Sequence, residues 1–138
     1  MFYSPDFFKV TPSQLSIWSG IIKHLFSEDY LWTEFLKQMT KSLAAQGMFA
    51  ASRAEETRLR SLNVKRLAFI VFCHDPDHFV EQLPTIQEKL VEAMKLKDSD
   101  KTISKVVLAM RVILVRMNSQ AMRSFWPVII TELVCHCI

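Results

Sequence analysis

The sequence predicts an all-α fold, namely a fragment of a HEAT- or armadillo-like α-solenoid built of antiparallel helix pairs. Three observations support this prediction: the scarcity of glycine, apolar residues at helical spacing, and an internal repeat. The 138 residues include only two glycines, Gly20 and Gly47. Because β-rich folds and phosphate-binding loops need glycine for tight turns and close backbone approach, this scarcity favours helices.

The composition is that of a globular protein, with 50% hydrophobic and 22% charged residues. The net charge is only +3 and the basic residues are mixed with acidic ones, so we do not expect a nucleic-acid partner, which needs clustered Lys and Arg. An odd cysteine count (Cys73, Cys135 and Cys137) suits reduced thiols in the cytosol. No signal peptide and no apolar stretch of membrane-spanning length is visible, so we expect a soluble chain whose membrane contact is peripheral.

The pattern divides the chain into two parts. Residues 1–51 are predicted to form an aromatic segment followed by a helix pair, and residues 52–138 two HEAT-like helix-pair repeats, the last of them cut short. Aromatic residues crowd residues 2–8, around a Ser-Pro-Asp turn. A free N-terminus rarely carries so many aromatic rings, so we expect this segment to pack on the first helices.

Each predicted helix in the first part has its own start signal. Thr11 is suited to the N-cap position and Gln14 to closing a capping box, with proline between them at the first helical position. Apolar residues at helical spacing continue this helix to about Phe26. Ser27 offers the next N-cap, for an amphipathic helix that ends near Gly47.

The second part opens with another capping box, formed by Ser52 and Glu55. The helix that follows must stop before Pro76, because the residue preceding a proline is disfavoured in the α region. After a short turn, Pro84 begins a helix that leads to a polar loop over residues 95–101.

Residues 104–117 form the next predicted helix, which is apolar nearly all round. We therefore expect it to be the most buried element. Asn118 is suited to capping a last helix over residues 120–137. Pro127 lies within that helix and is expected to interrupt or kink it.

A shift of 43 residues superimposes the two halves of the second part. Matched apolar positions in the first helix of each half are Val64 with Val107, Leu67 with Met110, Ile70 with Ile113 and Val71 with Leu114. In the second helix, Leu83-Pro84 falls on Trp126-Pro127. A period near 43 lies in the HEAT and armadillo range, and one helix pair cannot bury its apolar face without a neighbour.

Two groups of residues that could carry chemistry are better explained by structure. His74 and His78 have the spacing of a metal-binding pair on a helix, but Pro76 lies between them and breaks that geometry. Cys73 ends an apolar helix face and suits a small core residue better than a nucleophile. No G-x-S-x-G or H-E-x-x-H motif occurs, so we expect no enzyme, no cofactor and no metal site.

Basic residues gather in two stretches that are candidates for contact with a lipid or a protein partner. The first consists of Lys95, Lys97, Lys101 and Lys105, and the second of Arg53, Arg58, Arg60, Lys65 and Arg66. Anionic phosphoinositide headgroups would attract such patches with about 1 kcal/mol per basic residue near the membrane surface. The alternative is a solvated face, since two aspartates dilute the first stretch.

Four segments, taken in order, resemble the C-terminal region of the Dopey family. They are FYSPDFF at residues 2–8, KRLAF at 65–69 with LPTIQEKL at 83–90, RVILVRM at 111–117, and WPVIITEL at 126–133. The resemblance covers nearly the whole chain, and the W-P-x-I-x-x-E-L run is its most specific part. The family continues through further helical sequence after the position of Val134, whereas this chain ends at Ile138. We therefore expect marginal stability or self-association into a homo-oligomer.

The resemblance implies a segment of a very large cytosolic protein that lies peripherally on Golgi (trans-Golgi network) and endosome membranes. It implies a non-catalytic scaffold acting in protein transport between endosomes and the Golgi. The partners it implies are an Arf-exchange-factor-like Golgi scaffold, an aminophospholipid flippase and kinesin light chain. No catalytic residues exist in the family to carry over. The alternatives from the residues alone are a purely structural repeat segment, or a basic surface that binds anionic phosphoinositide lipids.

Overall fold

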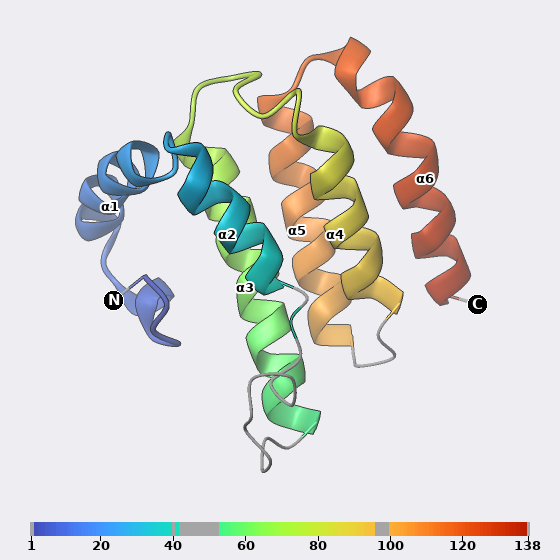
Figure 1. Ribbon diagram of the computed structural model, residues 1–138. Helices are drawn as coiled ribbons and strands as arrows, with labels where there is room; N and C mark the ends of the chain where they lie inside the picture. Colours follow the sequence, from blue (N-terminus) through green and yellow to red (C-terminus); the bar gives the residue numbers. More distant parts are fainter. Residues whose placement is uncertain (1, 40, 42–52, 96–99, 138) are drawn as a thin grey trace.

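A computed structural model of the chain (Figure 1) describes residues 2–39, 41, 53–95 and 100–137. Every regular element in these ranges is helical, so the all-α prediction is confirmed for them. The elements are the short 3-10 helix η1 (Phe7–Lys9) and the α-helices α1 (Pro12–Leu25), α2 (Asp29–Met39), α3 (Arg53–Cys73), α4 (Leu83–Lys95), α5 (Asp100–Arg116) and α6 (Ser119–Cys137).

The helices lie in two layers. One layer contains α1, α3 and α5, and the other contains α2, α4 and α6, as Figure 1 shows with α2 and α4 in front of α3 and α5. The most extensive packing joins α3 to α5 in the first layer and α4 to α6 in the second. Successive helices therefore alternate between layers, as stacked helix pairs do. The HEAT or armadillo assignment and the division at residues 51 and 52 stay predictions.

The start signals of two helices act as predicted. The Thr11 hydroxyl accepts a hydrogen bond from the Gln14 backbone N–H (3.4 Å), while the Thr11 N–H donates to Gln14 Oε1 (2.9 Å). This pair of bonds is a complete capping box at the start of α1. At the start of α6, Asn118 Oδ1 accepts from the Ala121 N–H at 2.9 Å. The capping box predicted at Ser52 lies outside the described residues.

Three details of the predicted elements are wrong. α5 begins at Asp100 rather than Ser104, so Lys101 is helical and not in a loop. The helix α6 continues across Pro127, so the predicted interruption is wrong, while the predicted kink stays a prediction. The Ser27 hydroxyl donates to the His24 carbonyl (2.6 Å) at the end of α1, so it satisfies an orphan acceptor of α1.

The N-terminal aromatic segment packs on the helices, as expected. Phe2 and Phe7 are buried, with Phe2 against Phe26 (ring centroids 5.8 Å apart). Phe7 lies in edge-to-face contact with Trp18 of α1 (5.3 Å) and Phe69 of α3 (5.6 Å). Edge-to-face pairs at this separation are favourable beyond the area they bury. The segment therefore fixes the position of α1 relative to α3.

The helix α5 is not the most buried element, which corrects the prediction for residues 104–117. Eight of the 21 residues of α3 are buried, against five of the 17 in α5. Within its layer, α3 has α1 on one side and α5 on the other, whereas α5 contacts only α3 among the described helices of that layer. Val107 and Leu114 are therefore about 40% exposed (40% and 43%) although their repeat equivalents in α3 are buried.

Candidate interaction surface

Three of the four predicted lysines lie in the described residues, on α4 and α5. Lys95 is exposed at the end of α4, and Lys101 is exposed in the first turn of α5. Lys105 is half-buried, one turn further along α5. Lys97 lies outside the described residues. Whether any of them contacts a lipid or a partner stays a prediction.

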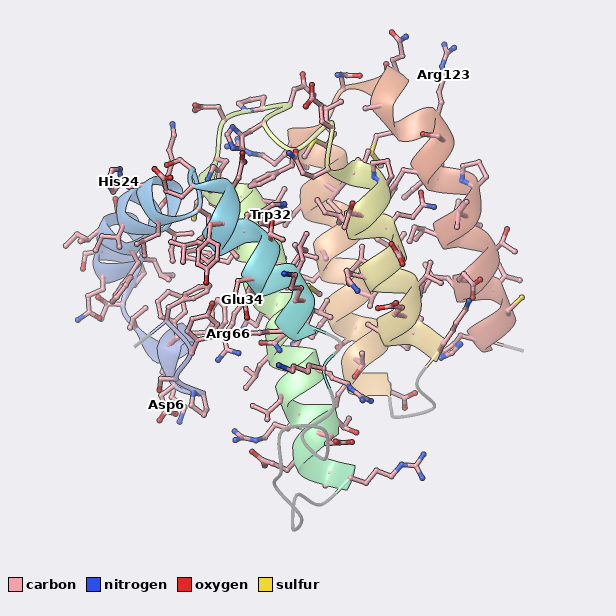
Figure 2. The ribbon with its side chains drawn as sticks, viewed as in Figure 1. Asp6, His24, Trp32, Glu34, Arg66 and Arg123 are labelled. Atoms are coloured by element: carbon pink, nitrogen blue, oxygen red, sulfur yellow. The ribbon has the colours of Figure 1, made fainter. Side chains whose placement is uncertain are left out.

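The second basic stretch is not a continuous charged surface, because Arg66 is buried (2% exposed). Its guanidinium donates to the carbonyl oxygens of Phe2 (3.2 Å) and Tyr3 (2.6 Å), and to Asn63 Oδ1 (2.7 Å). Figure 2 shows Arg66 on α3, on the side facing the N-terminal segment. Arg66 therefore holds the N-terminal segment against α3 and is not available to bind a lipid or a partner.

Arg58 is compensated by a neighbour on the same helix. Its guanidinium forms an ion pair with Glu55, one turn earlier, at 2.8 Å. Hydrogen bonding to Arg58 lowers the pKa of Glu55 and raises that of Arg58. Of the five residues in this stretch, Lys65 alone belongs to the surface that is defined in the next paragraph.

We define the α3/α5 face as the outward side of these two helices. It consists of three apolar residues and three basic ones: Phe72, Leu108, Val115, Lys65, Lys105 and Arg111. The two helices run in the same direction (Figure 1), so the 43-residue repeat aligns them turn by turn. Phe72 is thereby the repeat equivalent of Val115, and Lys65 that of Leu108. The face therefore carries two parallel rows of matched positions.

One contact joins the two helices at this face: the Arg116 guanidinium of α5 lies over the Phe72 ring of α3, 5.6 Å from its centroid. Lys65 Nζ lies 4.2 Å from the centroid of Phe8 in the N-terminal segment. Burial lowers the pKa of Lys65, and the positive charge of Lys105 lowers it further. The apolar side chains are exposed nonetheless: Phe72 by 55%, Leu108 by 37% and Val115 by 77%.

The three basic residues of the face lack a carboxylate partner. Lys65, Lys105 and Arg111 form no ion pair with any residue that the structure describes. An exposed apolar strip beside uncompensated cations is unusual for a surface that contacts only water. Sequence reasoning found Lys65 and Lys105 but missed the other four residues. The sequence signal available for these residues is their spacing along two aligned helices, but apolar spacing of this kind also predicts core residues.

His74 and His78, which have the sequence spacing of a metal-binding pair, lie in the corner after α3. The rings stack 4.7 Å apart, but His74 is buried and its Nδ1 shares a hydrogen bond with the Ile70 carbonyl at 2.7 Å. Within the described ranges, no group of three His, Cys, Asp or Glu side chains could hold a metal ion. Cys73 is buried, and burial raises the pKa of its thiol.

The loop after α3 ties two helix pairs together. Asp77 has a left-handed backbone (φ 64°), and its N–H donates to the Arg116 carbonyl at 2.8 Å. Its Oδ1 accepts from the Asn118 N–H at 2.7 Å. Arg116 also donates to the His74 carbonyl. The corner between α3 and α4 is thus joined to the corner between α5 and α6, which sets the alignment of the rows on the α3/α5 face.

The described helices include none that combines the length and the hydropathy needed to cross a bilayer.

Comparison with known proteins gives one consistent result. The sequence pattern of the family described as DOP1 C-terminal matches residues 1–137. A DOP1 homolog protein of Drosophila pseudoobscura pseudoobscura is 32% identical over 131 residues, which are 94% of this chain and 5% of that protein. Protein pad-1 of Caenorhabditis elegans is 32% identical over 129 residues, covering 93% of this chain and 5% of that protein.

Protein DOP1B of Xenopus laevis is 27% identical over 134 residues, which cover 97% of this chain and 6% of that protein. The chain thus spans about a twentieth of the length of the curated relatives it matches. No solved structure matches it. Because the family pattern covers residues 1–137, the chain belongs to the Dopey (DOP1) family and represents its C-terminal region.

Proposed function

We propose that this chain is a non-catalytic scaffold segment of a Dopey-like protein that acts in transport between endosomes and the Golgi. It acts through protein–protein contacts at the cytosolic surface of these membranes. The observation that carries the proposal is the match to the DOP1 C-terminal family along residues 1–137. Stacked helix pairs support it, because they present extended surfaces to partners.

The side chains that could do chemistry support a non-catalytic role. A nucleophilic cysteine needs a lowered pKa and access to solvent, whereas Cys73 is buried and its pKa is raised. His74 is buried, and its pKa is lowered mainly by that burial. One of its nitrogens is occupied by the Ile70 carbonyl. Neither residue is placed to act on a substrate.

Location and partners follow from the resemblance to the family. The proposed location is the cytosolic face of the trans-Golgi network and of endosomes, with peripheral attachment. The proposed partners of the whole protein are an Arf-exchange-factor-like Golgi scaffold, an aminophospholipid flippase and kinesin light chain.

The test is deletion of this segment from the full-length Dopey-like protein in cells. Recovery of the proposed partners by affinity purification and return of an endosomal cargo to the Golgi are then measured. We expect both to fall while the remaining protein stays folded and expressed at its normal level. A control protein carries Arg58→Ala, which removes one exposed ion pair and leaves the segment in place. Unchanged partner recovery and cargo return after deletion would leave the segment with a purely structural role.

A further inference from the structure

We propose that the α3/α5 face is a docking site for an amphipathic, acidic helix of a partner protein. The inference rests on the proposed scaffold function and names the surface and the partner chemistry. It is independent of Lys95 and Lys101, which lie outside the face.

The apolar side chains of the face match what a partner helix buries. Leu108 and Val115 are seven residues apart on α5, so both lie on the same side of that helix, two turns apart. Phe72 is the repeat equivalent of Val115 on the neighbouring helix, and its ring lies against Arg116, the residue after Val115. The three apolar side chains are therefore exposed on two aligned helices. A ridge of apolar side chains on a third helix can pack across two such helices.

The charges of the face select the sign of the partner. The positive charge of Lys105 lowers the pKa of Lys65, so these two lysines lie near each other, and exposed Arg111 lies between Leu108 and Val115 along α5. No described carboxylate neutralises any of the three. A partner helix with an apolar stripe flanked by glutamates or aspartates would pack on the apolar side chains of the face and pair with its three basic residues. Such complementarity determines specificity and association rate more than affinity.

The geometry favours a helix over a bilayer surface. Of the apolar side chains, only Val115 and Phe72 are more than half exposed, while Leu108 lies lower at 37%. Membrane insertion by a folded surface requires apolar side chains that project together beyond the polar ones. Here two lysines and an arginine accompany the apolar side chains, and an amphipathic helix can meet both kinds of residue with its apolar face and its flanks.

The test measures binding of designed helical peptides to the 138-residue chain by fluorescence anisotropy. The first peptide carries leucines at positions i, i+4 and i+7 with glutamates on both flanks. The second has the same composition in scrambled order, and the third has lysines in place of the glutamates. We expect binding of the first peptide only, weakening as salt is raised. Equal binding of the first and second peptides would overturn the proposal.

Variants of the chain locate the site. Val115→Glu introduces a charge at a side chain that is 77% exposed, so the fold tolerates it while the strip loses its apolar end. We expect affinity for the acidic peptide to fall at least tenfold. Ile17→Glu is the matched control, since Ile17 is 67% exposed on α1 and outside the face. Thermal unfolding followed by circular dichroism verifies that both variants are folded. Equal loss in both variants would contradict the assignment.

The charge of the site is tested with Lys105→Glu combined with Arg111→Glu. This variant should lose the acidic peptide and gain the lysine peptide. A parallel experiment uses vesicles of phosphatidylcholine with and without phosphatidylserine. Binding of the anionic vesicles that needs Val115 and Arg111, without binding of the acidic peptide, would replace the partner helix with a lipid surface.

Failure of this inference is distinguishable from failure of the proposed function. Val115→Glu is introduced into the full-length protein and compared with deletion of the segment in the same cells. If deletion reduces partner recovery and Val115→Glu does not, the segment is a scaffold and the docking site lies elsewhere. If neither change has an effect, both proposals are wrong.

Discussion

Replacement of Arg66 by alanine should cause a large loss of stability, although arginine is a charged residue. The Arg66 side chain is 2% exposed and has no carboxylate partner among the described residues. Its charge is held instead by the carbonyl oxygens of Phe2 and Tyr3, at 3.2 and 2.6 Å, and by Asn63 Oδ1 at 2.7 Å. Burial lowers the pKa of this guanidinium.

The expected magnitude follows from what alanine leaves behind. Hydrogen bonds to a charged group contribute about 1.5–3 kcal/mol each, so loss of the two shorter backbone bonds, to Phe2 and Tyr3, removes about 3–6 kcal/mol. The third backbone bond, to the Ser4 carbonyl, is long at 3.4 Å. The loss has an upper limit, because the N-terminal segment can detach and hydrate its carbonyls. Detachment exposes Phe2 and Phe7, whose burial contributes about 1.5–3 kcal/mol each. We therefore expect the free energy of unfolding to fall by about 3 kcal/mol.

The assay is urea denaturation, with chymotrypsin cleavage near Phe7 as a local probe. Arg66→Ala should accelerate this cleavage as well as reduce the free energy of unfolding. Arg66→Lys keeps the charge but not the planar donor fork, so it should recover only part of the loss. Arg58→Ala is the control, because its exposed ion pair with Glu55 contributes about 0–1 kcal/mol. A loss below about 1 kcal/mol for Arg66→Ala, or equal losses in both alanine variants, would refute this account.

Three further predictions concern the corner at the end of α3. Because burial is the main cause that lowers the pKa of His74 in the folded state, the unfolded state binds more protons; stability should be full above pH about 6.5 and decline as pH falls below it. Urea melts at several pH values should show a weaker decline for His74→Gln, which removes the buried imidazole and leaves its neighbours Lys23, Asp75 and His78 unchanged. In a Cys135→Ser, Cys137→Ser background, Cys73 should react with a thiol reagent only after denaturant is added, because it is buried and its pKa is raised; rapid reaction of the folded chain would contradict this. Asp77→Ala should lower the free energy of unfolding by about 2 kcal/mol, by loss of the Asn118 bond and by strain at a positive φ, and Asp77→Gly should recover the strain component.

The helices themselves were largely predictable from local signals. The capping box of Thr11 and Gln14 and the Asn118 cap depend on residues within one turn of each other, so the sequence contains everything needed to identify them. The end of α3 before Asp75 follows in the same way from Pro76. An interruption was expected at Pro127 because a proline inside a helix removes one backbone hydrogen bond. The helix α6 nevertheless continues, with the buried side chains of Phe125 and Ile129 packed on either side of the proline.

Burial of Arg66 was not predictable, because its partners lie more than sixty residues away in sequence. The hydrogen bonds to Phe2 and Tyr3 span 64 and 63 residues. In a sequence, this arginine is indistinguishable from Arg58 or Arg60, which lie on the same helix and are less buried. Only docking of the N-terminal aromatic segment on α3 brings backbone acceptors to the guanidinium. Arg66 is therefore excluded from the candidate basic surface by a tertiary contact that the sequence does not reveal.

The exposed residues of α5 show why an apolar helix is not the same as a buried one. Val64 and Val71 of α3 are buried, while Val107 and Leu114, their equivalents in α5, are not. The side chains are similar, so the difference lies in the neighbour: α5 covers α3, and no described helix covers α5 on the opposite side. Apolar periodicity thus reports which surface a helix can bury and not what buries it. This explanation does not extend to Leu108 and Val115, the outward residues of α5. Their repeat equivalents in α3 are Lys65 and Phe72, and Phe72 is itself exposed although α5 covers α3. The open side of α5 accounts for the exposure of Val107 and Leu114, and the proposed partner helix on the α3/α5 face is the occupant that we infer for Leu108 and Val115.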